Sequence, residues 1–372
     1  MNDIPRRVWL EISLDILTQN YRKIADAVAP AQVLAVLKAN AYGLGVLPIA
    51  QALAKAGAAG FGVAEPYEAL QLLPLGKPVQ ILSSILPEEI DPMVAAGVTL
   101  PVTDLVTARL ISAAAVRQGK TATIHFKLDT GMGRLGILAN EAVGVICETR
   151  RLPGLNCEGI FSHFPFAYET GSELTNHQMD LFCGILDEVA SHGITFVKRH
   201  IANSDAINNF PRACQPPFNV VRTGINLHGS FDSAGKRTLR VKPVLTLKTR
   251  LTAIRTLPTG TGIGYGHTYR LARPTCVGTV SAGYADGLPL ALSNRGYLLI
   301  HGIPCPVLGR ISMDYTTVSL ESVPDAVVGD EVVCLGGEGI HALTVEDWAA
   351  LKNTHPYEII CSFGNRVERR YV

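Results

Sequence analysis

Between residues 31 and 229, short apolar runs alternate with amphipathic segments. Apolar runs of this length, rich in Val and Ile, are typical of strands buried on both faces of a parallel sheet. The segment 173–191 keeps its apolar residues on one face at helical spacing, which predicts a long helix. The runs lie near 33–37, 61–64, 79–82, 98–102, 123–128, 157–161, 196–201 and 218–221.

Eight strands alternating with helices over about 200 residues predict a (β/α)8 TIM-like barrel. A doubly wound open sheet is the alternative, but the barrel uses every run without a leftover element. After residue 229 the pattern changes to short strands separated by turns, with one helix near 344–352. We therefore predict an α/β protein with a barrel domain over 1–236 and a mostly β domain over 237–372, with a linker at 230–236.

Composition and charge exclude several classes of function. Hydrophobic residues make up 47% of the chain and the formal net charge is +1, with no basic stripe for nucleic acid. No apolar run approaches the roughly 18 residues of a membrane span, and the charged start MNDIPRRVWLEISLD does not resemble a signal peptide. The eight cysteines form no CxxC pair, so we expect no metal site. These features favour a cytoplasmic protein.

Reactive side chains follow several of the apolar runs, where a (β/α)8 barrel carries its active site. Lys38 ends the first run, and an amine at the mouth of an apolar pocket has a lowered pKa and becomes nucleophilic. The alternative is that Lys38 only extends into solvent. Ser204 and Gly224 follow the last runs, where hydroxyls and backbone N–H groups bind phosphate. Ser204 could equally cap a helix that starts at Asp205.

The string AVLKANAYG around Lys38 resembles the pyridoxal-phosphate lysine motif of alanine racemases, and HFKLDTGMGRLG, HIANSD, VVRTGIN, TGTGIGYGHTY, SAGYADGLP, LGRISMDY and HPYEIICSFGNRV follow in that family's order. The resemblance covers nearly the whole chain. It implies pyridoxal 5'-phosphate as cofactor and a racemase that interconverts L-alanine and D-alanine, for cell-wall peptidoglycan or D-alanine catabolism. Two-base proton transfer would use Lys38 for the D-enantiomer and Tyr265 for the L-enantiomer. The resemblance also implies a homodimer whose active sites are shared between subunits.

The resemblance implies roles for further residues. Arg222 would donate to the cofactor's ring nitrogen and polarise His163, which would in turn support Tyr265. Arg134 and Met313 would bind the substrate carboxylate. The remaining cofactor residues would be Tyr42, Asn203, Ser204, Gly224, Ile225 and Tyr357, and Tyr284 would line the substrate pocket. Lys127 would be carbamylated, or would remain a free amine paired with Asp129.

The sequence departs from the family pattern at Leu44, Asn226 and His228, which leaves the preferred amino acid open. Serine or broad-specificity racemisation would use the same catalytic pair. Decarboxylases of basic amino acids need a cysteine near 313–315, and none is present there. A non-catalytic pyridoxal-phosphate carrier would resemble the barrel alone, so the second domain argues against it.

Overall fold

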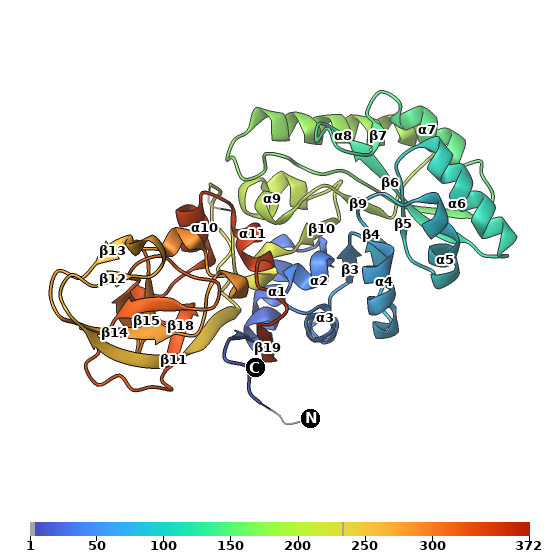
Figure 1. Ribbon diagram of the computed structural model, residues 1–372. Helices are drawn as coiled ribbons and strands as arrows, with labels where there is room; N and C mark the ends of the chain where they lie inside the picture. Colours follow the sequence, from blue (N-terminus) through green and yellow to red (C-terminus); the bar gives the residue numbers. More distant parts are fainter. Residues whose placement is uncertain (1–3, 233) are drawn as a thin grey trace. The chain divides into compact units, whose positions relative to one another are not determined.

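The computed structural model describes residues 4–232 and 234–372 (Figure 1). The chain divides into two compact units, which are described separately. Unit 1 comprises Met1–Ile16 and Lys242–Val372, and unit 2 comprises Leu17–Val241.

Within the described residues of unit 2, parallel strands form a barrel, which confirms the predicted fold. Neighbouring strands pair in the orders β10-β2-β3-β4 and β5-β6-β8-β9. A parallel bridge between Gln80 and Thr99 joins the two groups on one side. On the other side the Asn219 backbone N–H donates to the Arg199 carbonyl at 3.0 Å. The strands are β2 (Gln32–Val36), β3 (Gly60–Val63), β4 (Val79–Ile81), β5 (Leu100–Val102), β6 (Ala122–Asp129), β8 (Leu155–Phe161), β9 (Lys198–His200) and β10 (Val220–Thr223).

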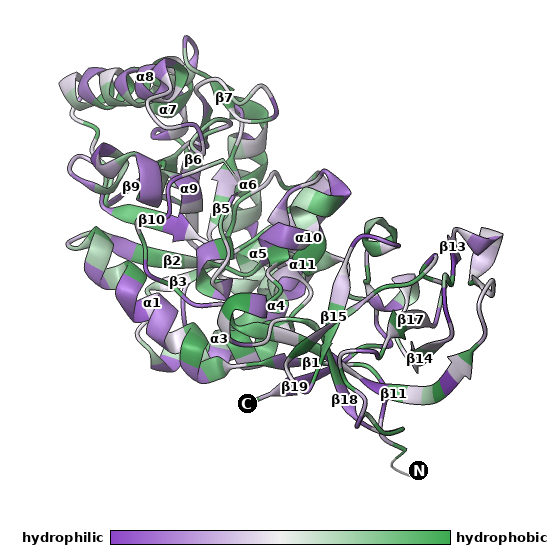
Figure 2. Cartoon of the chain, turned by 90° about the vertical axis from the view of Figure 1, so that its left-hand side faces the viewer, coloured by the Kyte–Doolittle hydropathy of each residue, from purple (hydrophilic) through white to green (hydrophobic). Residues whose placement is uncertain are grey.

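Helices surround these strands (Figure 1), and their polar and apolar residues alternate in Figure 2 as expected for helices with one buried face. The predicted helix 173–191 is confirmed as α8. The helices are α1 (Leu14–Val28), α2 (Lys38–Tyr42), α3 (Val46–Lys55), α4 (Pro66–Leu72), α5 (Pro87–Ala96), α6 (Leu105–Arg117), α7 (Ala142–Thr149), α8 (Glu173–Ser191) and α9 (Ser204–Asn209). The short strand β7 (Ile137–Leu138) pairs with β6, and the 3-10 helix η3 (Ile225–His228) follows β10.

Unit 1 is mostly β, as predicted, and its main sheet has the order β16-β15-β18-β11-β1-β19, with β14 and β17 attached. A second helix, α11, follows α10, where we expected only one. The elements are β1 (Trp9–Ile12), β11 (Leu245–Leu257), β12 (Gly262–Ile263), β13 (Tyr269–Arg270), β14 (Thr275–Val280), β15 (Tyr297–Ile300), β16 (Ile303–Pro306), β17 (Thr316–Ser319), β18 (Glu331–Leu335), α10 (Val345–Lys352), α11 (Pro356–Cys361) and β19 (Glu368–Tyr371).

Strand β1 belongs to unit 1, which differs from the predicted barrel domain of 1–236. The reason is strand pairing: β1 lies antiparallel to β11 and parallel to β19. The sequence pattern of 6–13 indicates a strand but carries no information about its partner.

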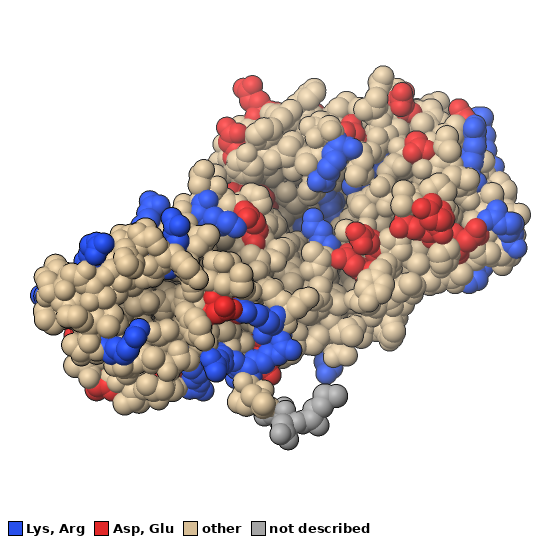
Figure 3. All heavy atoms as spheres, in the orientation of Figure 1, with Lys and Arg blue, Asp and Glu red and all other residues tan. Residues whose placement is uncertain are grey.

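Two further observations, one of surface charge and one of helix length and polarity, bear on function. On the face of the molecule drawn in Figure 3, acidic and basic side chains are interspersed over most of the surface, and several Lys and Arg side chains lie close together at the lower centre. Within 4–232 and 234–372, the helices are all too short or too polar to span a bilayer.

Candidate active site

Lys38 stands at the start of a left-handed turn that directly follows β2. Residues 39–42 all have positive φ, between 52° and 60°. This conformation costs roughly 1–2 kcal/mol for each residue with a side chain, so other contacts must hold it. The Ala39 backbone N–H donates to the carboxylate of Glu68, and the Asn40 side chain accepts an N–H from the start of α3. Strain of this kind concentrates at functional sites.

Tyr42, Ser204 and Gly224 meet at the C-terminal end of β10. The Gly224 backbone N–H donates to Ser204 Oγ at 3.1 Å. A Cβ on Gly224 would lie 1.9 Å from the Tyr42 hydroxyl, so only glycine allows this approach. The next residue, Ile225, begins η3, so its N–H is not used in the hydrogen bonds within that helix. Two hydroxyls and two backbone N–H groups form a donor set that suits a phosphate.

Asn203, not Ser204, caps α9. Asn203 Oδ1 accepts the Ala206 backbone N–H at 2.9 Å, and the helix begins at Ser204 itself. The alternative in which Ser204 caps a helix starting at Asp205 is therefore wrong. This leaves the Ser204 hydroxyl directed at Gly224.

Two residues that depart from the family pattern are buried beside this phosphate-type site. Asn226 Oδ1 accepts from Asn208 Nδ2 at 3.1 Å, and Asn226 Nδ2 donates to the Ser230 carbonyl at 3.0 Å, so both polar atoms of the Asn226 amide have partners. His228 packs edge-on against Tyr42, with ring centroids 5.2 Å apart. Neither ring nitrogen of His228 has a hydrogen-bond partner among the described residues, and burial lowers its pKa to about 4.

Arg222 lies within β10 rather than after it, and its guanidinium is buried among neutral groups. It donates to His200 Nδ1 at 2.9 Å and to His163 Nδ1 at 3.3 Å. It also donates to the carbonyl oxygens of Ser162, His200 and Ile201. Burial lowers the pKa of Arg222 to about 9, and no carboxylate in the described chain contacts it directly.

Lys127 lies two residues before the end of β6 and is buried. Its Nζ donates to the Leu82 carbonyl at 2.5 Å and lies 4.9 Å from the centre of the Phe161 ring. Burial, followed by the charges of Arg222, Arg134 and Lys38 in that order, lowers the pKa of Lys127 to about 7. These four cations therefore share one region of unit 2.

Asp129 binds the backbone of the loop that carries Arg134. Its carboxylate accepts the N–H groups of Gly131, Met132, Gly133 and Arg134, at 2.8–3.1 Å. The hydrogen bonds of Asp129 are thus with this loop. Its negative charge also raises the pKa of Lys127, against the larger effects that lower it. The residue order DTGMG is a turn signature that could have indicated this role. For Glu68, which holds the turn after Lys38, no local pattern existed.

In unit 1, Tyr284 and Met313 lie on two loops pressed together. The Tyr284 backbone N–H donates to the Ser312 carbonyl at 3.1 Å. A Cβ on Gly283 would lie 2.3 Å from the Met313 carbonyl oxygen, so glycine is required there. Tyr265 begins the 3-10 helix η4 (Tyr265–His267). All three predicted side chains are exposed: Tyr265 by 71%, Met313 by 52% and Tyr284 by 44%.

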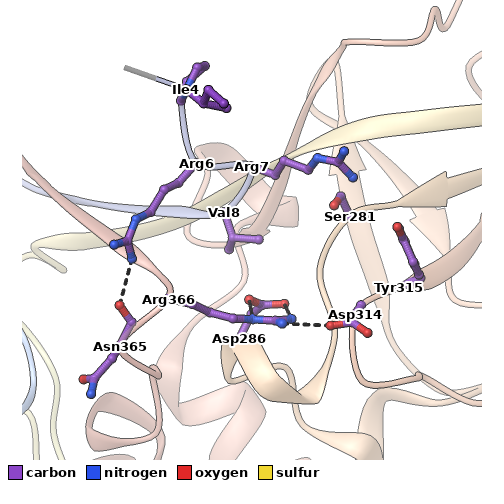
Figure 4. Close-up of a pocket in the computed structure, with 11 residues that line it drawn as sticks. Ile4, Arg6, Arg7, Val8, Ser281, Asp286, Asp314, Tyr315, Asn365 and Arg366 are labelled. Atoms are coloured by element: carbon purple, nitrogen blue, oxygen red, sulfur yellow. Dashed lines mark hydrogen bonds and ion pairs between the residues drawn. The ribbon is translucent and has the colours of Figure 1, made fainter. Parts of the chain in front are cut away.

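Arg366 fastens these two loops to each other, a role that the sequence patterns did not indicate. Figure 4 shows its guanidinium in contact with Asp286 and Asp314, and all three residues line an open pocket of about 720 Å³. It forms a two-point ion pair with the buried Asp286, at 2.7 and 2.9 Å, and a third contact to Asp314 at 2.8 Å. Hydrogen bonds to both carboxylates raise the pKa of Arg366. Asp286 lies two residues after Tyr284, and Asp314 directly follows Met313.

The predicted site residues thus fall into two groups, one in each unit. Tyr357, the second residue of α11, is half-buried in unit 1, with its ring 6.0 Å from that of His355. The group in unit 2 comprises Lys38, Tyr42, Lys127, Arg134, His163, Asn203, Ser204, Arg222, Gly224 and Ile225, and the group in unit 1 comprises Tyr265, Tyr284, Met313 and Tyr357.

Comparisons with known proteins identify the family of both parts of the chain. Residues 12–231 match the family "Alanine racemase, N-terminal domain", and residues 244–371 match "Alanine racemase, C-terminal domain". The alanine racemase of Desulforamulus reducens is 38% identical over 98% of this chain and 99% of the relative. The crystal structure of the alanine racemase from Streptomyces lavendulae has a TM-score of 0.92 and 35% identity, over 99% of this chain and 98% of that one. The Bartonella henselae alanine racemase, described with covalently bound pyridoxal phosphate, has a TM-score of 0.87 and 30% identity, over 99% and 100%. The chain belongs to the alanine racemase family.

Proposed function

We propose that this protein is a pyridoxal-phosphate-dependent racemase that interconverts L-alanine and D-alanine. The observation that carries the proposal is the phosphate-type donor set of Tyr42, Ser204, Gly224 and Ile225, in the same unit as Lys38 and the buried Arg222. This set fits a cofactor with a phosphate at one end and a ring nitrogen at the other. Tyr357 would add a further hydroxyl. The product D-alanine would serve peptidoglycan synthesis, and the reverse reaction D-alanine catabolism.

Lys38 would hold the cofactor covalently and exchange the substrate's Cα proton on one face. When bound, the cofactor withdraws electrons from Cα and makes this proton acidic. A base reaches only its own face, so inversion needs a second group on the opposite face, and Tyr265 would supply it. Arg222 would donate to the ring nitrogen without releasing its own proton, because a pKa of about 9 keeps it charged at pH 7.

The tautomer of His163 supports a role beside Tyr265. Arginine has only donors, so the Arg222 contact makes His163 Nδ1 an acceptor and places the ring proton on Nε2. Burial, followed by the charge of Arg222, lowers the pKa of His163 well below its usual value, so the ring is neutral at pH 7. A neutral ring with a proton on Nε2 can donate to the Tyr265 oxygen and stabilise its ionised form.

Arg134 and the Met313 backbone N–H would bind the substrate carboxylate, and Tyr284 would border the pocket. Lys127 would act as a carbamate. Its pKa of about 7 leaves much of the amine neutral at pH 7, so its nitrogen can bond to the carbon of CO2 and release a proton. The resulting anion would offset the charges of Arg134, Arg222 and Lys38.

We further propose a homodimer in which each site combines Lys38 of one subunit with Tyr265 of the other. The exposure of Tyr265, Met313 and Tyr284 supports this, because aromatic and Met side chains are enriched where surfaces become covered by a partner. A two-fold dimer would complete both sites with one interface.

The decisive experiment is proton exchange. The protein loaded with pyridoxal phosphate is incubated with L-alanine or D-alanine in D2O, and product chirality and Cα deuterium are measured. We expect each enantiomer of alanine to be converted into the other, and deuterium to appear at Cα of both. A carrier would exchange nothing, and faster turnover of serine than of alanine would refute the substrate assignment. Exposed Glu148 in α7 supplies the control, since Glu148→Gln should leave the rates unchanged.

Complementation tests the shared site. Lys38→Ala and Tyr265→Ala, each inactive, are denatured together, refolded with cofactor and assayed. Random pairing makes about half the dimers mixed, and one site in each is intact, so about a quarter of wild-type sites should return. If dimers form but activity stays at the level of the two parents, the site is built within one chain.

A further inference from the structure

Arg222 is one end of a chain of side-chain hydrogen bonds that runs through the interior of unit 2. Its Nη1 lies 2.9 Å from His200 Nδ1, and His200 Nε2 lies 3.1 Å from His125 Nδ1. His125 Nε2 in turn lies 2.9 Å from a carboxylate oxygen of Glu158. Both histidines are buried, whereas the Glu158 side chain is 24% exposed. The chain thus links the buried guanidinium to a carboxylate that reaches solvent.

Arg222 and Glu158, at the two ends of this hydrogen-bond chain, determine which nitrogen of each histidine carries the ring proton. Arg222 can only donate, so His200 Nδ1 accepts and the His200 proton lies on Nε2. That N–H donates to His125 Nδ1, which places the His125 proton on Nε2. The ionised Glu158 can only accept, so it receives this last N–H. Both histidines are therefore neutral, with the proton on Nε2 and each hydrogen bond pointing from Arg222 towards Glu158.

Backbone features place these rings. Residues 124 and 125 of β6 pair with 157 and 159 of β8, so Glu158 is an extra residue in a β-bulge, which redirects its side chain. A Cβ on Gly159 would lie 2.7–2.8 Å from three ring atoms of His125, so the ring occupies the space that this glycine leaves. Phe161 stacks on His200, with centroids 5.0 Å apart and planes at 3°. The bulge, the glycine and the stacked ring all favour the same arrangement.

The charge states of the groups in this hydrogen-bond chain agree with the assigned protons. The hydrogen bond from His125, together with the charge and hydrogen bond of Lys198, lowers the pKa of Glu158 to about 2 against the opposing effect of its partial burial, so the carboxylate is ionised. Burial lowers the pKa of His125 and, further still, that of His200, so both rings stay neutral. Lys198 Nζ also contacts Glu158, at 3.1 Å, on the side facing solvent.

We propose that Glu158 is a positioning residue for Arg222, acting through His125 and His200. This hydrogen-bond chain fixes the plane of the Arg222 guanidinium. The negative charge of Glu158 also polarises the two histidines and, through them, Arg222, whose direct hydrogen-bond partners are all neutral. The proposal rests on the proposed function only in assigning Arg222 to the cofactor's ring nitrogen. The tautomers and their dependence on Glu158 stand independently of it.

The first test is ¹⁵N NMR of the histidine-labelled holoenzyme between pH 5.5 and 9. In the wild type, we expect His125 and His200 to be neutral, with the proton on Nε2, throughout this range. Glu158→Ala should shift the signals of both rings, including His200, which Glu158 does not touch. Lys198→Met removes the other Glu158 contact and should leave His200 unchanged. A charged ring or a proton on Nδ1 in the wild type, or a His200 signal unmoved in Glu158→Ala, would overturn the proposal.

The second test is kinetic and uses variants that keep the fold. Glu158→Gln retains an acceptor oxygen but no charge, and we expect kcat to fall about tenfold with KM for alanine nearly unchanged. Gly159→Ala should displace His125 by its added Cβ and move the same NMR signals without changing any charge. Gly184→Ala in α8, where a Cβ meets no atom within 4 Å, is the matched control.

A Glu158→Gln variant with wild-type kcat would show that the charge plays no part and would overturn the kinetic half of the proposal. A wild-type protein that does not racemise alanine would refute the proposed function instead. The NMR experiment would still decide whether Glu158 controls the tautomers of the two histidines.

Discussion

A single methyl group at position 224 tests the phosphate site. In Gly224→Ala the new Cβ would lie 1.9 Å from the Tyr42 hydroxyl oxygen and 2.7 Å from its Cζ, both far inside van der Waals contact. The backbone at 224 has a φ of −129°, so alanine itself adds no left-handed strain. Tyr42 is buried, with its ring against His228, and has little room to retreat. The substitution must therefore move Tyr42 away from position 224.

Overpacking of this kind costs roughly 1–3 kcal/mol. The affinity for pyridoxal phosphate changes for a separate reason. If the displaced Tyr42 no longer donates to the phosphate, the lost hydrogen bond to a charged group, roughly 1.5–3 kcal/mol, raises Kd by about 10- to 150-fold. Absorbance titration of the apoenzyme measures this Kd. Gly144→Ala in α7, where a Cβ meets nothing within 4 Å, should bind the cofactor normally.

A double-mutant cycle isolates the clash from other effects of the methyl group. In a Tyr42→Ala background the colliding atoms are gone, so Gly224→Ala should weaken binding by less than about twofold. Equal losses in the two backgrounds would refute the reasoning, because the methyl group would then act on something other than Tyr42. Wild-type affinity in the single variant would refute it as well.

Four further predictions concern Lys127, Asp129 and Gly283. The folded pKa of Lys127, about 7, lies below its ordinary value of 10.5, so between these pH values the unfolded chain binds more protons and stability rises with pH. In CO2-free buffer, Lys127→Met should flatten this rise in urea unfolding midpoints, and an unchanged pH slope would contradict it. With ¹³C-bicarbonate, the wild type should show a carbamate NMR signal that Lys127→Met lacks; a signal present in both would place the carbamate elsewhere. Asp129→Ala should raise KM for alanine by about tenfold, because four backbone N–H groups lose their acceptor and the Arg134 loop relaxes; an unchanged KM would separate this loop from substrate binding. Gly283→Ala should lower the thermal unfolding temperature, because its Cβ would meet the Met313 carbonyl at 2.3 Å, and wild-type stability would show that the two loops can separate.

Local patterns were sufficient for the barrel and for most of the candidate site. Each buried strand is a short apolar run and α8 has a helical apolar face, and burial imposes both patterns on the sequence directly. The strand order of a (β/α)8 barrel follows the chain order, so the sequence alone assigns Lys38, Lys127, His163 and Ser204 to one end of the strands. The resemblance to the family then implied roles that the residue types alone left open, and these roles stay predictions.

The remaining features depend on contacts between residues far apart in the chain, which no local pattern records. Strand β1 joins unit 1 because its pairing partners come more than 200 residues later. Glu68 holds the left-handed turn after Lys38 from 29 residues away. Asn203 rather than Ser204 caps α9, and the Ser204 hydroxyl accepts instead from Gly224, 20 residues later.

The chain from Arg222 to Glu158 depends most completely on the tertiary structure. Glutamate and histidine within a strand look like ordinary polar residues of an exposed face. Only the register of β6 against β8, with its bulge, places Glu158 beside His125. A hydrogen bond needs its two atoms within about 3 Å, and strand pairing decides that distance. The sequence determined which chemical groups this protein has, and the tertiary structure determined which of them meet.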